Sequence, residues 1–313
     1  MANRTFRDYI FLTLKGMGMG AADVVPGVSG GTIAFITEIY EELVESIRSV
    51  NLGAVKKVFQ EGLKGFWKAI NGNFLAAVFL GILISVFTLA NVLEHLLQVY
   101  PILVWSFFFG LIIASAIYVA RKITDWDWKK IAAVLAGIVI AYLITTLTPA
   151  KTPNAYWFVF LSGALAICAM ILPGISGAFI LLLLGKYQYI LGAINDLNFL
   201  VLGVFFIGAV VGLISFSNLL SWLLHRFHNL TIAVLSGFMI GSLNKVWPWK
   251  RTLETFTDRH GEVQPLVQKN ILPAQFECVT GQESHLLWAI LAALAGIILI
   301  FAVESITRNK KKV

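Results

Sequence analysis

Six long apolar stretches constrain this chain more than any other feature of its sequence. Each is close to the 20 or so residues that an α-helix needs to cross a hydrocarbon core of ~30 Å. They are Phe74–Leu97, Ile102–Ala120, Ile131–Leu147, Phe199–Leu224, Leu230–Val246 and Leu286–Val303. The chain is 58% hydrophobic and only 13% charged, whereas soluble domains carry about 25% charged residues. This composition excludes soluble enzymes and nucleic-acid binders and predicts an all-α integral membrane protein.

Two further apolar stretches, Tyr9–Tyr40 and Tyr156–Leu184, are longer than one span and are interrupted by a Pro-Gly pair. A shift of 147 residues superposes the first interruption on the second, which indicates an internal repeat. We expect residues 1–150 to form a first copy with a re-entrant helical hairpin, an interfacial helix and three transmembrane helices. Residues 151–313 are then a second copy with a hairpin, three transmembrane helices and a long outer loop at 248–285.

The distribution of Lys and Arg residues orients the chain. Basic residues cluster before residue 16, at 48–68, at 121–130 and after residue 307, and cytoplasmic loops carry an excess of such residues. The clusters fall on one side if both termini are cytoplasmic and each Pro-Gly segment enters and leaves on the same side. Each copy then crosses an odd number of times. This predicts six transmembrane helices plus two re-entrant hairpins in an inverted-topology repeat, which is the architecture of alternating-access transporters.

Residues 51–73, between the first hairpin and the next apolar stretch, have the pattern of an amphipathic helix. Apolar residues such as Phe59 and Leu63 recur at helical spacing, and Lys56, Lys64 and Lys68 lie opposite them. The pattern is typical of a helix in the interface of an anionic inner leaflet. Packing of the apolar face on the protein itself is an equally good interpretation.

The two Pro-Gly turns are candidate binding sites, because irregular backbone at membrane depth must be buried in protein or line a wet cavity. In each turn Pro ends a half-helix, Gly allows a positive φ, and Ser is placed to cap the next half-helix. Free N–H groups at residues 29–32 and 176–178 are suited to bind a phosphate or carboxylate. The predicted binding residues of the turns are Pro26, Gly27, Ser29, Gly30, Gly31, Thr32, Pro173, Gly174, Ser176 and Gly177. The alternative is that small residues only let two hairpins cross closely.

Four charged residues near the turns are further candidates. Asp23 is the deepest carboxylate, and such a group costs ~2.5–3.5 kcal/mol on insertion scales, so we assign it to coupling with a proton or sodium ion. Glu38 shares that assignment, with a solvated helix end as the alternative. Lys186 and Lys245 are candidate ligands for an anionic headgroup, with snorkelling to the interface as the alternative.

Motifs of the common catalytic and metal sites are missing from the sequence. It has no Ser-His-Asp order, no Cys-x-x-Cys and no nucleotide-binding loop, and its five His residues are scattered. We therefore expect no catalytic residue, no metal, no cofactor and no nucleic-acid partner.

The run from Gly18 to Ala34 resembles the signature of the bacterial polyprenyl-phosphate (undecaprenyl phosphate) translocase family, PopT-like, formerly a multi-pass domain of unknown function. The segments Leu172–Gly177, Leu184–Tyr187 and Gly237–Pro248 also resemble that family. The resemblance implies a flippase that recycles undecaprenyl phosphate, a carrier lipid of cell-wall peptidoglycan synthesis. Transport would run from the outer to the inner leaflet of the bacterial cytoplasmic membrane. The coupling role assigned to Asp23 adds the expectation that a cation or proton gradient drives it.

A second resemblance is to membrane undecaprenyl-pyrophosphate phosphatases, whose hairpins carry a Pro-Gly-x-Ser-Arg-Ser motif. This sequence has Gly30 and Gly177 where that motif has Arg. Without the Arg, charge on a transferring phosphoryl group is not stabilised, which favours binding without hydrolysis. A transporter is therefore predicted over the alternatives, a phosphatase-like enzyme and a small-anion secondary transporter.

Overall fold

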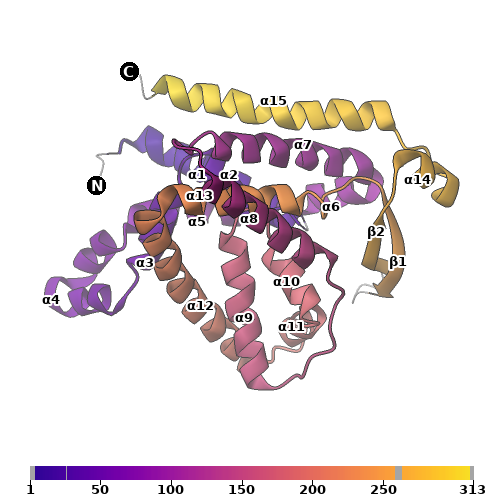
Figure 1. Ribbon diagram of the computed structural model, residues 1–313. Coiled ribbons are helices and arrows are strands. Elements are labelled where there is room, and N and C mark those ends of the chain that lie inside the picture. Colours follow the sequence, from indigo (N-terminus) through magenta and orange to yellow (C-terminus); the bar gives the residue numbers. More distant parts are fainter. Residues whose placement is uncertain (1–3, 26, 258–262, 311–313) are drawn as a thin grey trace.

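The computed structural model describes residues 4–25, 27–257 and 263–310, and these are mostly helical (Figure 1). The first half contains α1 (Phe6–Val24), α2 (Gly30–Ile36), α3 (Tyr40–Arg48), α4 (Leu52–Ala69), α5 (Gly72–Thr88), α6 (Ala90–Val99), α7 (Pro101–Ala120) and α8 (Trp128–Thr146). The second half contains α9 (Tyr156–Ile171), α10 (Gly177–Leu183), α11 (Tyr187–Asn195), α12 (Phe199–Arg226), α13 (His228–Ser242), β1 (Lys250–Thr257), β2 (Val263–Asn270), α14 (Pro273–Thr280) and α15 (Leu286–Lys310).

The two Pro-Gly segments fold alike. Each begins with a long helix, α1 or α9, and continues after the turn with a 7-residue helix, α2 or α10. Each ends with a 9-residue helix, α3 or α11. The bounds of these short helices differ by the same 147 residues that superpose the sequences. The repeat in the sequence therefore corresponds to a repeat in local structure.

Four helix pairs supply most of the packing between helices: α1 with α5, α9 with α12, α7 with α15, and α8 with α13. Gly16 and its repeat mate Gly163 lie where the first two pairs approach closely. A Cβ at Gly16 would be 2.2 Å from the Val78 carbonyl oxygen, and one at Gly163 would be 2.3 Å from that of Phe205. Helices approach this closely only where a side chain is absent, so the first helix of each copy packs in the same way.

In the described part of the chain, four helices, α7, α8, α12 and α15, are long and apolar enough to cross a membrane, and there are up to six spans if each of two bent helix pairs is one span. Two predicted spans differ from the structure. Phe74–Leu97 is divided at Leu89 between α5 and α6, and α6 is the more polar part, with Glu94 and His95. Leu230–Val246 overlaps the 15-residue α13, which begins earlier, at His228, ends at Ser242 and rises only ~22 Å.

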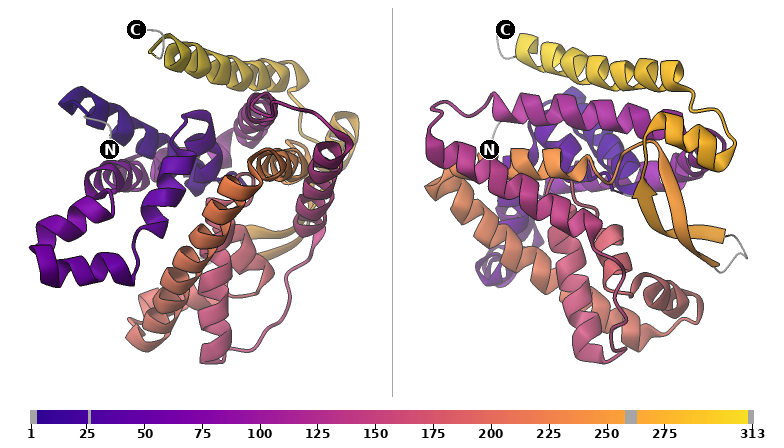
Figure 2. Two further views of the ribbon diagram at one scale, coloured as in Figure 1. Left: turned by 60° about the vertical axis from the view of Figure 1, so that its left-hand side comes forward. Right: turned by 45° about the vertical axis from the view of Figure 1, so that its right-hand side comes forward.

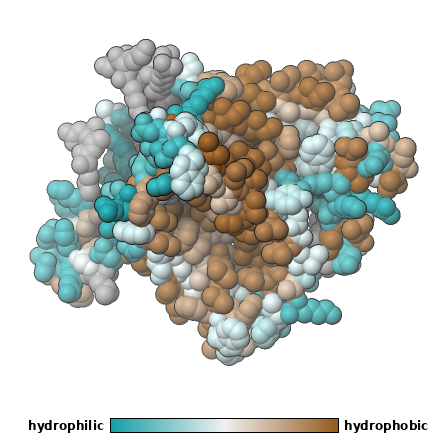
Figure 3. Space-filling model, viewed as in Figure 1, coloured by the Kyte–Doolittle hydropathy of each residue, from teal (hydrophilic) through white to brown (hydrophobic). Residues whose placement is uncertain are grey.

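The surface of the helices is apolar over a wide area. Figure 3 shows hydrophobic residues spread across the middle of the molecule, with hydrophilic residues gathered toward its ends. On α8, Leu135, Val139 and Leu143 are exposed, and on α12 Phe206 and Ile207 are exposed. A soluble monomer rarely exposes so large an apolar area, so these side chains face lipid and the chain is a multi-pass membrane protein.

The loop predicted at 248–285 contains regular structure that the sequence analysis did not predict. Strands β1 and β2 pair as an antiparallel hairpin, with Lys250 opposite Asn270 and Arg251 opposite Lys269, and α14 follows. The all-α prediction is therefore wrong for this segment. The hairpin lies at the end of the molecule opposite to the start of α1 and the end of α15 (Figures 1 and 2).

Helix α4 extends away from the other helices at the end where α1 begins (Figure 1). Its apolar side chains are open, with Phe59 86% exposed and Leu63 77% exposed. The interpretation in which this face packs on the protein itself is therefore wrong for these side chains. Its placement in a membrane interface stays a prediction.

Candidate functional site

The two Pro-Gly turns meet inside the molecule. Ser29 donates from Oγ to the carbonyl oxygens of Met170 (3.1 Å) and Leu172 (3.0 Å), and the Gly174 N–H donates to Thr32 Oγ1 (3.1 Å). Each turn carries a left-handed glycine, with φ of 89° at Gly27 and 87° at Gly174. The predicted positive φ is confirmed at both positions. Pro173 is buried in the second turn, and Pro26 lies outside the described residues.

The amide groups of the first turn already have acceptors. The Gly30 N–H donates to Asp23 Oδ1 (2.7 Å), the Gly31 N–H to Ser29 Oγ (3.1 Å), and the Thr32 N–H to the Ser29 carbonyl (2.9 Å). The expectation of free N–H groups at these three residues is therefore wrong. The reason is that Asp23, at the end of α1, places its own carboxylate at the start of α2.

The second turn differs from the first because Met170 stands where the first copy has Asp23. Ser176 makes no capping hydrogen bond to α10, whereas Ser29 caps α2. The predicted cap is thus confirmed in one copy and wrong in the other.

The crossing of the turns leaves no space for a phosphate between them. A Cβ at Gly31 would be 2.5 Å from the carbonyl oxygen of Ile171, the last residue of α9 before the second turn. This glycine lets backbone approach backbone, as the packing interpretation predicts. An anion that reaches the turns must therefore lie beside the crossing.

A cavity of about 310 Å3 opens beside α10, between the end of α8, the residues after α13 and the β-hairpin. We call it the lysine cavity, because three of the described residues that line it are Lys245, Lys250 and Lys269 and none is Asp or Glu. Polar side chains complete the wall, namely Thr145, Thr146, Asn244 and Asn270. Cationic and neutral donors without a carboxylate are what a phosphate group requires.

Lys245 joins the lysine cavity to the first turn and to α10. A Cβ at Gly27 would lie 2.7 Å from Lys245 Cγ, so the side chain of Lys245 runs along the first turn. Its Nζ lies 4.4 Å from the ring centroid of Phe179, on α10. Lys245, which the sequence analysis predicted as a ligand, therefore lies against the first turn and against α10, the helix that follows the second turn.

Lys250 was missed by the sequence analysis. Its Nζ lies 3.7 Å from the centroid of the Trp105 ring and donates to the Lys245 carbonyl oxygen (2.7 Å). Burial, and then the adjacent Lys245 ammonium, hold the pKa of Lys250 well below its usual value. The β-hairpin brings Lys250 and Lys269 to the cavity, and its strands lack the alternation of polar and apolar residues that would have signalled it.

The other two charged candidates lie elsewhere. Lys186 is 1% exposed and donates to the Thr152 carbonyl (3.0 Å) and to Asn154 Oδ1 (2.7 Å), so it holds a loop and does not line the lysine cavity. Glu38 has a φ of 58° and accepts a hydrogen bond from Tyr118 (2.8 Å), with Lys122 at 3.8 Å. Because its repeat mate is Gly185, this left-handed corner is a feature of both copies.

Comparison with known proteins shows the family of this chain. Residues 19–264 match a family described as undecaprenyl phosphate translocase-like. The chain is 48% identical over 304 residues to a polyprenyl-phosphate transporter of Vibrio cholerae serotype O1, covering 97% of this chain and 98% of that protein. It is 34% identical over 254 residues to a polyprenyl-phosphate transporter of Staphylococcus aureus, covering 75% and 85% respectively. No solved structure matches. The chain therefore belongs to the undecaprenyl phosphate translocase-like family.

Proposed function

We propose that this protein is a transporter that recycles undecaprenyl phosphate from the outer to the inner leaflet of the bacterial cytoplasmic membrane, for cell-wall synthesis. The lysine cavity carries the proposal, because it combines three Lys residues with neutral donors and lies against the first turn and α10. A phosphate group leaving water loses several kcal/mol of hydration. Ammonium groups at the cavity offset that loss, while the polyprenyl tail stays in lipid against the exposed apolar side chains.

The topology that we propose is an inverted repeat of residues 1–150 and 151–313, with both termini cytoplasmic. Support comes from the matching short helices of the two copies and from the position of the start of α1 and the end of α15 at one end of the molecule (Figure 1). The lysine cavity then opens to the outside. Helix α4, with Lys56, Lys57, Lys64 and Lys68, lies on the anionic inner leaflet.

Asp23 has the coupling role in this proposal, with Glu38 as the second candidate. An anion that moves inward works against a negative-inside potential at ~2.3 kcal/mol per charge per 100 mV, which co-transport of a proton or sodium ion would offset. The Asp23 carboxylate holds the first turn through Gly30, so a change in its charge acts directly on the turn that Lys245 contacts.

Asp23→Asn tests the coupling role in vesicles with an imposed proton or sodium gradient. The Asn oxygen can still accept from Gly30, so the variant should transport undecaprenyl phosphate down its own gradient and lose acceleration by the ion gradient. Asp196→Asn, at an exposed position after α11, is the control and should keep that acceleration. Unchanged gradient dependence in Asp23→Asn would remove Asp23 from the coupling mechanism.

The function itself is tested by reconstituting the purified chain in liposomes and following undecaprenyl phosphate between leaflets. We expect transport in the wild-type protein and at least a tenfold slower rate in Lys245→Gln. The same liposomes supplied with undecaprenyl pyrophosphate test the enzyme alternative, since release of inorganic phosphate would favour it. Uptake of free inorganic phosphate in place of the lipid would favour the small-anion transporter.

A further inference from the structure

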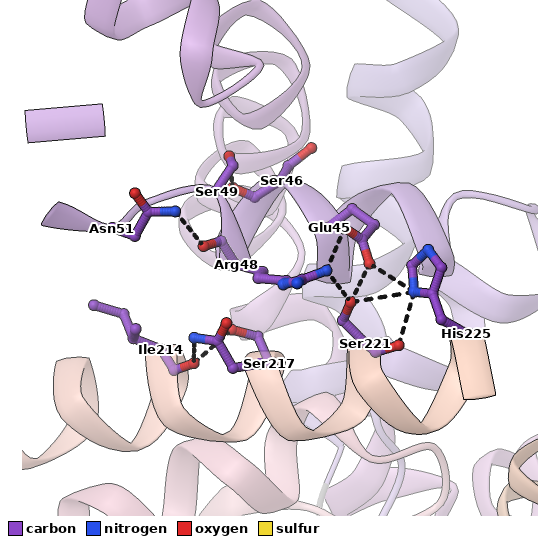
Figure 4. Close-up of polar contacts among 10 residues, drawn as sticks. Glu45, Ser46, Arg48, Ser49, Asn51, Ile214, Ser217, Ser221 and His225 are labelled. Carbon is purple, nitrogen blue, oxygen red and sulfur yellow. Dashed lines mark hydrogen bonds and ion pairs between the residues drawn. The ribbon is translucent and has the colours of Figure 1, made fainter. Parts of the chain in front are cut away.

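A second cluster of anion-binding groups lies where α3 crosses α12, and it contains none of the residues discussed above (Figure 4). Arg48 donates from Nη1 to Ser221 Oγ (2.8 Å) and lies 3.4 Å from Glu45 Oε2. Ser221 donates to Glu45 Oε1, and His225 Nδ1 lies 3.5 Å from that oxygen. His225 Nδ1 also lies 2.8 Å from the Ser221 carbonyl oxygen. A guanidinium, a hydroxyl and an imidazole thus surround one carboxylate.

The cluster is built to be reached from water. Ser221 is fully buried and forms the base of the cluster. The side chains of Arg48 and Glu45 are 45% and 42% exposed, and that of His225 is 68% exposed. Ser221 and His225 are four residues apart on α12 and so share a face of that helix. A ligand can therefore approach the donors without unfolding either helix.

The cluster belongs to one end of the molecule only. Helix α3 lies at the end where α1 begins, away from the β-hairpin and the lysine cavity (Figure 1). The repeat mates of Glu45 and Arg48 are Gly192 and Asn195, so α11 does not carry a second version. The contact also joins the two halves of the chain, since α3 belongs to the first and α12 to the second.

We propose that Arg48, Ser221 and His225 form a binding site for the phosphate group of the lipid at the cytoplasmic side, and that Glu45 occupies this site when no lipid is present. The proposal rests on the proposed function. Guanidinium, hydroxyl and imidazole groups are strong donors to phosphate oxygens. The oxygens of the Glu45 carboxylate take the place of the phosphate oxygens when no lipid is bound. Because Glu45 is tethered beside the donors, it competes with the phosphate, weakens its binding, and so favours release of the lipid into the inner leaflet.

The site can be measured on the full chain with geranyl phosphate, a short and soluble polyprenyl phosphate. Cys168 and Cys278 are replaced, and Asn51→Cys supplies an exposed reporter three residues after Arg48 and outside the long apolar helices. Vesicles are sorted so that α3 faces the medium, and the rate at which a membrane-impermeant maleimide labels the reporter is followed as geranyl phosphate is added. We expect saturable protection by geranyl phosphate and none by geraniol.

Two variants of the cluster and two matched controls decide the assignment. Glu45→Gln should lower the half-protecting concentration at least fivefold, because the competing carboxylate is gone. Arg48→Gln should raise it at least tenfold, and Arg48→Lys should recover part of the loss, which shows that the fold is intact. The controls are Glu41→Gln, whose carboxylate pairs with His228 at 3.2 Å, and Arg226→Gln, beside His225. Each makes the same charge change near the cluster and should stay within twofold of the wild type.

Failure of this inference is separable from failure of the proposed function. Equal protection in Glu45→Gln, Arg48→Gln and the two controls would overturn the site, even if the wild-type protein transports undecaprenyl phosphate. The cluster variants can also be measured in a Lys245→Gln background, which we expect to transport slowly. The same order of half-protecting concentrations in that background would support the site independently of the lysine cavity.

Discussion

At the scale of single residues, the main feature is that this protein uses its own carboxylates where a phosphate-binding protein would be expected to leave donors free. Asp23 accepts from the first turn, and Glu45 accepts from Ser221 and lies beside Arg48 and His225. The lysine cavity is different, because none of its described lining residues is acidic. No acidic side chain of that lining competes with an external anion for the Lys side chains.

Lys250 should take up a proton when an anion enters the lysine cavity. Its pKa is held low by burial and by Lys245, and a nearby phosphate favours the charged form and raises that pKa. Affinity should therefore fall as the pH rises through the raised pKa of the complex. At pH 8, calorimetry of geranyl phosphate binding in buffers of different ionisation enthalpy should detect up to one proton taken up.

Lys250→Arg should bind geranyl phosphate at pH 8 with less proton uptake, because Arg stays charged throughout. Lys151→Arg, an exposed residue outside the cavity, should take up protons as the wild type does. Equal uptake in Lys250→Arg and the wild type would assign the proton to another group.

At the scale of elements, the helix pairs depend on missing side chains. Gly81 on α5 lies against α1, where a Cβ would be 2.0 Å from the Thr13 carbonyl oxygen. In a bilayer there is no hydrophobic gain from bringing two helices together, so close packing supplies much of the attraction. The same reasoning explains why α1 and α9 keep their partners although the rest of the two copies has diverged.

Gly81→Ala should destabilise the protein by about 1–3 kcal/mol, because the added methyl group must push α1 away from α5. Gly203→Ala, on α12, is the matched control, since a Cβ there meets nothing within 4 Å. Thermal unfolding of the two variants in detergent gives the comparison. A melting temperature for Gly81→Ala no lower than that of Gly203→Ala would show that α1 and α5 can separate at little cost.

At the scale of the whole molecule, the two ends are equipped differently for an anion. The end with the β-hairpin presents ammonium groups without a carboxylate, and the end with α3 presents donors that a carboxylate already occupies. In the proposed orientation, with the first end outward, the phosphate would bind tightly on the outer side and would be released more readily on the inner side, where Glu45 competes for the donors. The lipid and ion gradients would still set the direction of net transport.

The orientation of the molecule is tested by single cysteines in a background without Cys168 and Cys278. A membrane-impermeant reagent applied to intact cells should label cysteines at Lys151 and Asn195, and should label those at Lys64 and Asp127 only after the membrane is opened. All four positions lie outside the long spans. Labelling of Asp127 from the outside would disprove the inverted arrangement, because the loop between α7 and α8 fixes the direction of both halves.

The sequence by itself determined the membrane class, the repeat of 147 residues and the left-handed glycines at 27 and 174, because hydropathy, self-similarity and backbone sterics are local properties. It also singled out Lys245, which follows from its place at the end of an apolar helix. Only the tertiary structure decided that Asp23 and Ser29 accept from the amide groups of the first turn, that Gly31 lets the two turns approach closely, and that Lys250 and Lys269 reach a cavity through a β-hairpin. Such facts depend on contacts between residues as far apart in the chain as Ser29 and Met170. Spacing along the sequence cannot show which donors the fold has already satisfied.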